Sequence, residues 1–406
     1  SHNRRFFNIM TLRTIPLATE IGPFLGCAST MKRRRAESTQ GYQDTLFQRS
    51  HYIVATIAVM ILAFQGCGED DNQSPRATEN EDATESSEPV FFEGLEFPEV
   101  VFESKFVEVE GSLMHYYEAG DPDGPAIVLS HGWPSWSYIW RDVIPHLEDS
   151  GRVIAFDLIG FGRSNKLEDN NYSFAVQQVH FAGFIDALGL ENLILVLHDW
   201  GSGIGFDYAA RNSSNIRGIV FFEAMMPPRL PFTSLEDAFP GDPQGAMAFQ
   251  AWRTPGVGED IFLNQAQATE VFLPGFVLRE LSDDELNAYR APWPTPESRW
   301  PLWWVPNELP VAGVPESTDA LIRNYIDWLQ TTDVPMLEFF ATPGLTGQAD
   351  VVEWTIQNIA NLTTVDLGPG IHFLQEDYPE EIGSGIAEWI ASVPIRKTRR
   401  LPKSDD

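Results

Sequence analysis

An aspartate, Asp199, lies where a buried strand is expected to turn sharply into a helix. Residues 193–197 form an aliphatic run, the sequence His-Asp-Trp-Gly follows, and residues 204–212 have a helical pattern. A turn of this kind presents one side chain, which in the Gly-x-Ser-x-Gly motif is a serine nucleophile. Asp199 occupies the serine position, although Leu197 replaces the first glycine. Asp199 is therefore a candidate nucleophile, and the competing interpretation is a helix N-cap.

A carboxylate nucleophile suits chemistry at a saturated carbon. It is already ionised at neutral pH and needs no base before it attacks, so displacement would give an alkyl ester of the enzyme. Breaking that ester requires water activated by a general base, for which histidine is the usual residue. Ser202 is excluded as the nucleophile, because Trp200 and Ile204 stand where its motif requires glycines.

His372 is the candidate for the general base. It follows a predicted strand by a glycine-rich loop, in the sequence "VDLGPGIHFLQED", and it comes after the nucleophile in the chain. His131 and His198 flank other turns, where hydrogen bonding in the core or in a loop accounts for them. His180 lies in the middle of a predicted helix and is interpreted as structural.

A carboxylate must orient the imidazole of this base, and the residues alone leave two candidates. Glu223 ends the apolar run "IVFFEA", and Asp350 lies in the loop after "MLEFFAT". The backbone N–H groups of Trp200 and Trp133 are expected to stabilise an oxyanion, because one residue follows the nucleophile and the other follows an earlier strand.

The elements that must position these residues alternate along the chain. Over residues 91–227 and 311–395, short aliphatic runs alternate with helical patterns, which predicts an α/β fold with a mostly parallel central sheet and helices on both faces. Residues 228–310 break the alternation and are rich in Pro, Phe and Trp, so we expect an inserted helical cap. Within it, the Ser-x-x-Glu sequence that starts at Ser282 predicts a helix capping box rather than a metal site.

The composition excludes several classes of partner. The chain carries 58 acidic and 27 basic residues, a formal charge of −31, and such a surface repels phosphate backbones, so nucleic acid is not expected to bind. The glycine motifs lack the last glycine of G-x-G-x-x-G and no Walker sequence occurs. Neither a cofactor nor a metal is expected.

Residues 1–68 are predicted to be an N-terminal extension that carries an export signal. Residues 52–64 form an apolar stretch of 13 residues, which suits a signal peptide but is shorter than the roughly 20 residues of a spanning helix. Cys67 follows a small residue just after this stretch, as in lipoprotein processing. Residues 69–90 have the composition of a disordered acidic tether, and residues 396–406 form a basic tail.

These terminal features predict an exported protein, either periplasmic or anchored to a membrane through a lipid on Cys67. Ordinary signal cleavage and an uncleaved anchor are the alternatives. If the extension results from a wrong start, with Met10 or Met31 as the initiator, a cytoplasmic location is expected instead.

Several motifs in one order resemble the haloalkane dehalogenases of the α/β-hydrolase superfamily, in the subgroup with an Asp-His-Glu triad. The resemblance covers about residues 91–395. It is carried by "HGWPSWSYIWRDVIPHL", "DLIGFGRSNK", "HDWGSGIGF", "FFEAMMPP", "PNELPVAG" and "GPGIHFLQEDYPEEIGSGIAEWI". It implies hydrolysis of small halogenated hydrocarbons by water to an alcohol, a halide ion and a proton.

Residue by residue, the resemblance implies a role for each candidate. Asp199 would attack the carbon that bears the halogen, and His372 would activate the water that hydrolyses the ester. Glu223, which matches the family position better than Asp350 does, would orient the imidazole. The indole N–H of Trp200 would hold the departing halide.

One position departs from the family pattern and leaves alternatives open. Asparagine usually follows His-Gly as the second halide donor, whereas Trp133 stands here. Its indole N–H is expected either to donate to the halide or to rotate away, with the larger ring filling part of the pocket. Epoxide hydrolases share the His-Gly-aromatic-Pro sequence and need cap tyrosines, for which Tyr289 and Tyr325 are candidates. A non-hydrolytic relative, luciferase-like or ligand-binding, is the third class.

We predict that the Cys67→Ser substitution releases the protein from the membranes of a bacterial host, because a serine cannot carry the thioether-linked lipid. Membrane and soluble fractions of cells that express the two forms provide the measurement. Identical fractionation would contradict lipidation at Cys67.

Overall fold

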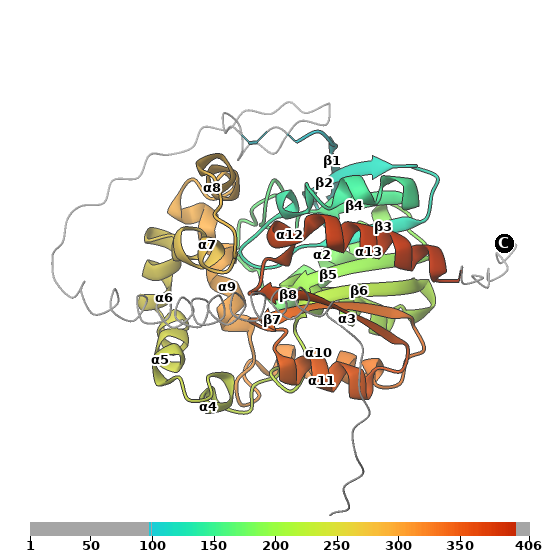
Figure 1. The fold of residues 1–406 in the computed structure, drawn as a ribbon. Coiled ribbons are helices and arrows are strands. Elements are labelled where there is room, and N and C mark those ends of the chain that lie inside the picture. The colour runs from blue at the N-terminus through green and yellow to red at the C-terminus, as the bar shows by residue number, and fades with distance from the viewer. Residues whose placement is uncertain (1–96, 99, 395–406) are drawn as a thin grey trace, which may run out of the picture. The chain divides into compact units, whose positions relative to one another are not determined.

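The computed structural model describes residues 97–98 and 100–394, whose strands form one sheet in the order β1-β2-β4-β3-β5-β6-β7-β8 (Figure 1). Residues 1–96, which hold the predicted export signal and the tether, lie outside the described part, as does the basic tail. The strands are β1 (Glu103–Val109), β2 (Ser112–Gly120), β3 (Ala126–Ser130), β4 (Arg152–Phe156), β5 (Leu193–Asp199), β6 (Ile216–Ala224), β7 (Met336–Pro343) and β8 (Leu362–Gly370).

The sheet is mostly parallel, which confirms the sequence prediction. Strand β2 pairs antiparallel with both β1 and β4, and every other neighbouring pair runs parallel. Strands β3, β5 and β6 are almost wholly buried, as expected for aliphatic strands covered on both faces. Since parallel strands share one carboxyl edge, the residues that follow β3, β5 and β6 come together there.

Helices cover both faces of the sheet, as predicted. One face carries η2 (Ser137–Trp140), η3 (Ile144–His146), η4 (Glu148–Ser150) and α13 (Pro379–Ser392). The opposite face carries α2 (Phe174–Ala187), α3 (Trp200–Arg211), α10 (Glu316–Leu329) and α11 (Ala349–Asn358). Two short helices, η5 (Ser213–Asn215) and α12 (Leu374–Asp377), lie in connecting segments.

Between β6 and α10, residues 228–310 form short helices grouped beside the carboxyl edge of the sheet (Figure 1). The capping box predicted at Ser282 is present, since its hydroxyl accepts from the Glu285 N–H and its own N–H donates to the Glu285 carboxylate. The helices are α4 (Leu235–Ala238), α5 (Pro243–Trp252), α6 (Val257–Glu259), η6 (Asp260–Asn264), η7 (Ala268–Phe272), α7 (Leu273–Gly275), α8 (Asp283–Arg290), η8 (Pro296–Arg299) and α9 (Trp300–Glu308).

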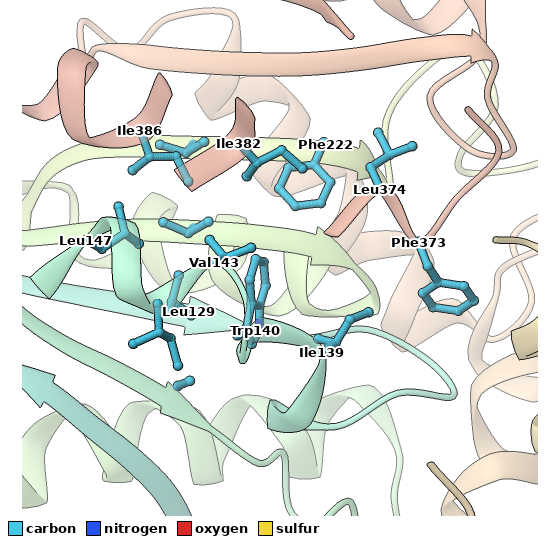
Figure 2. Packing of buried hydrophobic residues seen from close by; sticks show 14 of the residues in the cluster. Leu129, Ile139, Trp140, Val143, Leu147, Phe222, Phe373, Leu374, Ile382 and Ile386 are labelled. Atoms are coloured by element: carbon cyan, nitrogen blue, oxygen red, sulfur yellow. The ribbon is translucent and has the colours of Figure 1, made fainter. Parts of the chain in front are cut away.

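One packed hydrophobic layer lies between the sheet and α13. Figure 2 shows Phe222 beside Ile382 and Trp140 beside Val143, and the rings of Trp140 and Phe222 meet edge to face at 6.0 Å. Phe373 and Leu374, at the start of α12, belong to the same cluster. The segment that follows His372 is therefore packed into this core. Among the described residues, no helix is long and apolar enough to span a membrane.

Candidate active site

Asp199 lies at the end of β5 in a strained turn. Its backbone has φ 47° and ψ −123°, a left-handed conformation that costs a non-glycine residue about 1–3 kcal/mol. The register of β5 on β6 shifts at this point, and α3 begins at the next residue. The side chain of Asp199 accepts no N–H from the second or third residue of α3, the bond that defines an N-cap. The N-cap interpretation is therefore not supported, and the turn presents the carboxylate to the site.

Two glycines allow the chain to approach this turn closely. A Cβ atom on Gly132 would lie 2.4 Å from Cβ of Asp199, and one on Gly201 would lie 2.3 Å from the backbone oxygen of His131. Both distances are too short for any side chain. Ser202, which sequence reasoning excluded as nucleophile, donates its hydroxyl to the backbone oxygen of Asp199 at 2.5 Å and so closes the turn.

The Asp199 carboxylate faces two backbone donors and one imidazole. Its Oδ1 accepts the backbone N–H of Trp133 at 2.7 Å, and the backbone N–H of Trp200 also donates to this carboxylate. Its Oδ2 lies 3.6 Å from Nε2 of His372. Burial raises the pKa of Asp199, and His372 together with the two N–H groups opposes that rise. The backbone N–H groups of Trp133 and Trp200 thus meet the carboxylate of Asp199, and their role toward an oxyanion stays a prediction.

His372 lies between two carboxylates. Its Nδ1 lies 3.0 Å from Oε2 of Glu223, and its Nε2 faces Asp199, while the ring itself is only 3% exposed. Burial alone would lower the pKa of His372, but the hydrogen bond to Glu223 and the charge of Asp199 raise it above its ordinary value. Nδ1–H donates to Glu223, so Nε2 is free to accept a proton on the side of Asp199.

Glu223 rather than Asp350 meets the imidazole. Its side chain is fully buried, and Oε2 also accepts the backbone N–H groups of Leu345 and Thr346 at 2.9 and 2.8 Å. Asp350 instead forms an ion pair with Arg229 at 3.0 Å and is 45% exposed. Both alternatives were open from the residues alone, and the structure selects the one that the family resemblance favoured.

Sequence reasoning missed the contacts that hold the histidine loop. Nε2 of His198, which the sequence assigned only to core or loop hydrogen bonding, lies 3.0 Å from the backbone oxygen of His372. Burial lowers the pKa of His198 well below its ordinary value, so the ring is neutral and donates to that oxygen. From the cap, the backbone oxygen of Phe276 accepts the N–H groups of His372 and Phe373, both at 3.2 Å. Neither contact has a signal in the local sequence.

The indole N–H of Trp200 is a buried donor with no partner among the described residues. The ring is 1% exposed and meets Phe174 edge to face at 5.0 Å, which fixes its orientation. A buried donor without an acceptor costs about 1–3 kcal/mol, so a bound anion beside Asp199 would satisfy it. This is the contact expected for a halide-binding Trp200.

The side chain of Trp133 contradicts one of its two expected roles. Its indole Nε1–H donates to the backbone oxygen of Leu302 in the cap at 2.9 Å, so it is already used and does not donate to a halide in this structure. The ring packs instead against Phe262 and Phe272 at 5.9 and 5.7 Å. The contribution of Trp133 to the site is its backbone N–H together with apolar surface.

Aromatic side chains from the cap surround this position. Phe272 stacks on Phe276 at 6.1 Å and meets Trp252 at 4.9 Å, and Phe276 reaches the ring of His372 at 6.2 Å. An apolar wall of this kind excludes water from the reacting atoms and favours an uncharged substrate. Among residues 97–98 and 100–394, no group of three or more metal-binding side chains is arranged to hold an ion.

The two tyrosines considered as acids are bound elsewhere. The hydroxyl of Tyr289 donates to the carboxylate of Glu376, and that of Tyr325 donates to the backbone oxygen of Met225 at 2.8 Å. Both rings are buried. The structure therefore contradicts the expectation that either one serves as the proton donor of an epoxide-opening site.

The remaining histidine candidates are structural, as interpreted from the sequence. Nδ1 of His131 bonds to the oxygen of Gly132 at 2.9 Å, and its Nε2 accepts the N–H of Leu158 at 3.1 Å. Nδ1 of His180 donates to the oxygen of Val176, one helical turn earlier.

Comparison with known proteins finds a matching family model and several similar sequences. Residues 125–301 match the family model of the alpha/beta hydrolase fold. A haloalkane dehalogenase of Mesorhizobium japonicum is 39% identical over 289 residues, which are 71% of this chain and 91% of that protein. A haloalkane dehalogenase of Bradyrhizobium diazoefficiens is 36% identical over 301 residues, which are 71% of this chain and 97% of that protein.

Solved structures give the same picture. The crystal structure of an ancestral haloalkane dehalogenase is 40% identical, with a TM-score of 0.67, and the match covers 71% of this chain and 98% of that one. The haloalkane dehalogenase from Bradyrhizobium elkani is 36% identical, with a TM-score of 0.67, and the match covers 72% and 98% of the two chains.

We predict that Glu223→Gln lowers the pKa of His372, because the neutral amide no longer stabilises the imidazolium and the effect of burial remains. NMR titration of the imidazole signals measures this pKa. Asp350→Asn is the matched control and should leave it unchanged. If the pKa of His372 shifts in the Asp350 variant and not in the Glu223 variant, Asp350 would be the carboxylate that orients the imidazole.

Proposed function

The chain belongs to the haloalkane dehalogenase family of the α/β-hydrolases, and we propose that Asp199, His372 and Glu223 carry out its two chemical steps. The protein is a hydrolase that cleaves carbon–halogen bonds and gives an alcohol, a halide ion and a proton. The observation that carries the residue assignment is the imidazole of His372, with one nitrogen on Glu223 and the other facing Asp199.

In the first step, Oδ2 of Asp199 attacks the carbon that bears the halogen. Oδ1 is held by the backbone N–H of Trp133, which leaves Oδ2 as the oxygen free to attack. The carbon–halogen bond breaks, and the halide leaves with the electron pair. The product of this step is an alkyl ester of Asp199.

In the second step, water attacks the ester carbonyl as its proton passes to Nε2 of His372. The negative charge that develops on Oδ1 is stabilised by the backbone N–H groups of Trp133 and Trp200. The bond between the carbonyl carbon and the alkoxide oxygen then breaks, the alkoxide takes the second proton of the attacking water and leaves as the alcohol, and His372 releases its proton to solvent, which regenerates the carboxylate of Asp199. Glu223 keeps Nδ1 protonated and stabilises the imidazolium while it exists.

The halide is held by the indole N–H of Trp200. An uncharged donor binds the ion as it forms and still allows it to leave, which a full positive charge would hinder. The aromatic cap wall supplies the rest of the pocket. We assign small halogenated hydrocarbons as substrates on that basis.

We also propose that the protein is exported and attached to a membrane through Cys67. The supporting features are the apolar stretch at residues 52–64 and the small residue that precedes the cysteine. The substitution of Cys67 described above tests this proposal separately from the chemistry.

We predict that His372→Phe keeps the alkylation step and blocks hydrolysis, so that turnover falls by about 10²–10⁴-fold and an ester accumulates on Asp199. Mass spectrometry of the protein after incubation with 1-bromobutane should find a butyl adduct on the peptide that contains Asp199. Asp199→Asn in the same background is the control without adduct. An unmodified peptide in a folded His372 variant that still binds substrate would contradict the mechanism.

We predict that Trp200→Phe weakens halide binding about tenfold or more, because a hydrogen bond to a charged group contributes about 1.5–3 kcal/mol. Trp133→Phe is the matched control: its indole N–H donates to Leu302, so halide affinity should change little. Product inhibition by bromide measures both affinities. A larger loss in the Trp133 variant would make the Trp133 indole the halide donor instead.

A further inference from the structure

A serine, a histidine and an aspartate form a second hydrogen-bonded chain outside the site just described. Oγ of Ser104 on β1 lies 2.9 Å from Nε2 of His115 on β2, and Nδ1 of His115 lies 2.7 Å from Oδ2 of Asp157, directly after β4. The register places Ser104 opposite Tyr117, two residues from His115, so both side chains lie on one face of the sheet. The order hydroxyl, imidazole, carboxylate is the one that activates a serine nucleophile.

The carboxylate of this cluster is fixed and ionised. Asp157 is fully buried, and its two oxygens accept the backbone N–H groups of Ser137 and Arg163 at 2.7 and 2.9 Å. Burial alone would raise the pKa of Asp157, but the adjacent His115 and these surroundings lower it overall. An ionised Asp157 holds the proton of the imidazole on Nδ1, so Nε2 accepts the hydroxyl proton of Ser104.

Solvent exposure increases from the carboxylate to the serine, as a nucleophilic site requires. Both Asp157 and His115 are 0% exposed, whereas Ser104 is exposed at the surface. The rings of Phe106 and Tyr117 pack against the imidazole at 5.2 and 4.7 Å and keep it in place. Ser104 therefore lies on the solvent side of the cluster, and the imidazole behind it is shielded from solvent.

A cation stands beside the serine oxygen. Nη1 of Arg163 donates to Oγ of Ser104 at 2.9 Å. The guanidinium also lies 5.1 Å from the ring of Phe97 and 5.6 Å from that of Phe106. A positive charge at this distance stabilises negative charge on or near the serine oxygen, and the aromatic rings offer an apolar surface. These surroundings fit a small uncharged ester.

We propose that Ser104 is a second nucleophile of this protein, which takes the acyl group of small activated esters independently of Asp199. Oγ attacks the ester carbonyl as its proton passes to Nε2 of His115. The proton then goes to the departing alcohol oxygen as the carbon–oxygen bond breaks, which leaves an acyl ester on Ser104. Water, deprotonated by the same nitrogen, attacks the acyl group, releases the carboxylic acid and restores the hydroxyl. The competing interpretation is that Ser104 only satisfies a buried histidine.

The test uses the full chain with Asp199→Asn as background, so that the first site cannot contribute. Hydrolysis of p-nitrophenyl acetate is followed by the release of p-nitrophenol, before and after Ser104→Ala is added. The activity should fall about tenfold or more with this substitution, since the nucleophile is lost. Ser392→Ala is the matched control, because Ser392 is also exposed but its hydroxyl donates to the backbone oxygen of Trp389. It should change nothing.

A covalent probe gives a second readout. Diisopropyl fluorophosphate should phosphorylate Ser104 faster than Ser392, and the adduct should appear on the peptide that contains Ser104. In the otherwise natural chain, Ser104→Ala should keep full dehalogenation, which shows that this variant is folded. Equal ester hydrolysis with and without Ser104, together with an unlabelled Ser104, would overturn the proposal and leave the assignment of Asp199 untouched.

Discussion

The site depends on one buried imidazole held between two carboxylates. Burial lowers the pKa of His372, and the hydrogen bond to Glu223 at 3.0 Å raises it again, together with the charge of Asp199. The carboxylate of Glu223 is held in turn by the backbone N–H groups of Leu345 and Thr346. The loop after β7 therefore fixes the acid, the acid fixes the base, and the base faces Asp199. Each link lies at the carboxyl edge of the same parallel strands.

The backbone conformation at the two carboxylates also constrains the site. Both Asp199 and Glu223 have φ 47°, a conformation that the surrounding structure must impose. At the nucleophile, the glycines at positions 132 and 201 leave room for the close approach of the surrounding chain. The cap adds a further hold on the base, since the backbone oxygen of Phe276 binds the start of the histidine loop. Residues far apart in the sequence thus position atoms within a few ångströms of one another.

Much of this arrangement could be predicted from the sequence. The periodicity of apolar residues and the order of the motifs along the chain can both be read directly from it. The parallel sheet followed from alternating aliphatic runs, and Asp199, His372 and Glu223 each follow a predicted strand. The choice of Glu223 over Asp350 needed the family resemblance, since both carboxylates follow strands. The indole of Trp133 could not be placed at all: its partner, the oxygen of Leu302, is 169 residues away. The Ser104 cluster was not predicted either: the alternation around Glu110-Gly111 indicates a hairpin of β1 and β2, but not that Ser104 meets the imidazole of His115.

The central claim is that Asp199, rather than water, forms the first bond to the carbon. A single turnover in H₂¹⁸O with excess enzyme tests it directly, with mass spectrometry of both the alcohol and the Asp199 peptide. If the ester forms and water attacks its carbonyl, the heavy oxygen enters the carboxylate of Asp199 and the alcohol keeps an ordinary oxygen. Heavy oxygen in the alcohol after one turnover, with none in the peptide, would mean direct attack by water and would contradict the account.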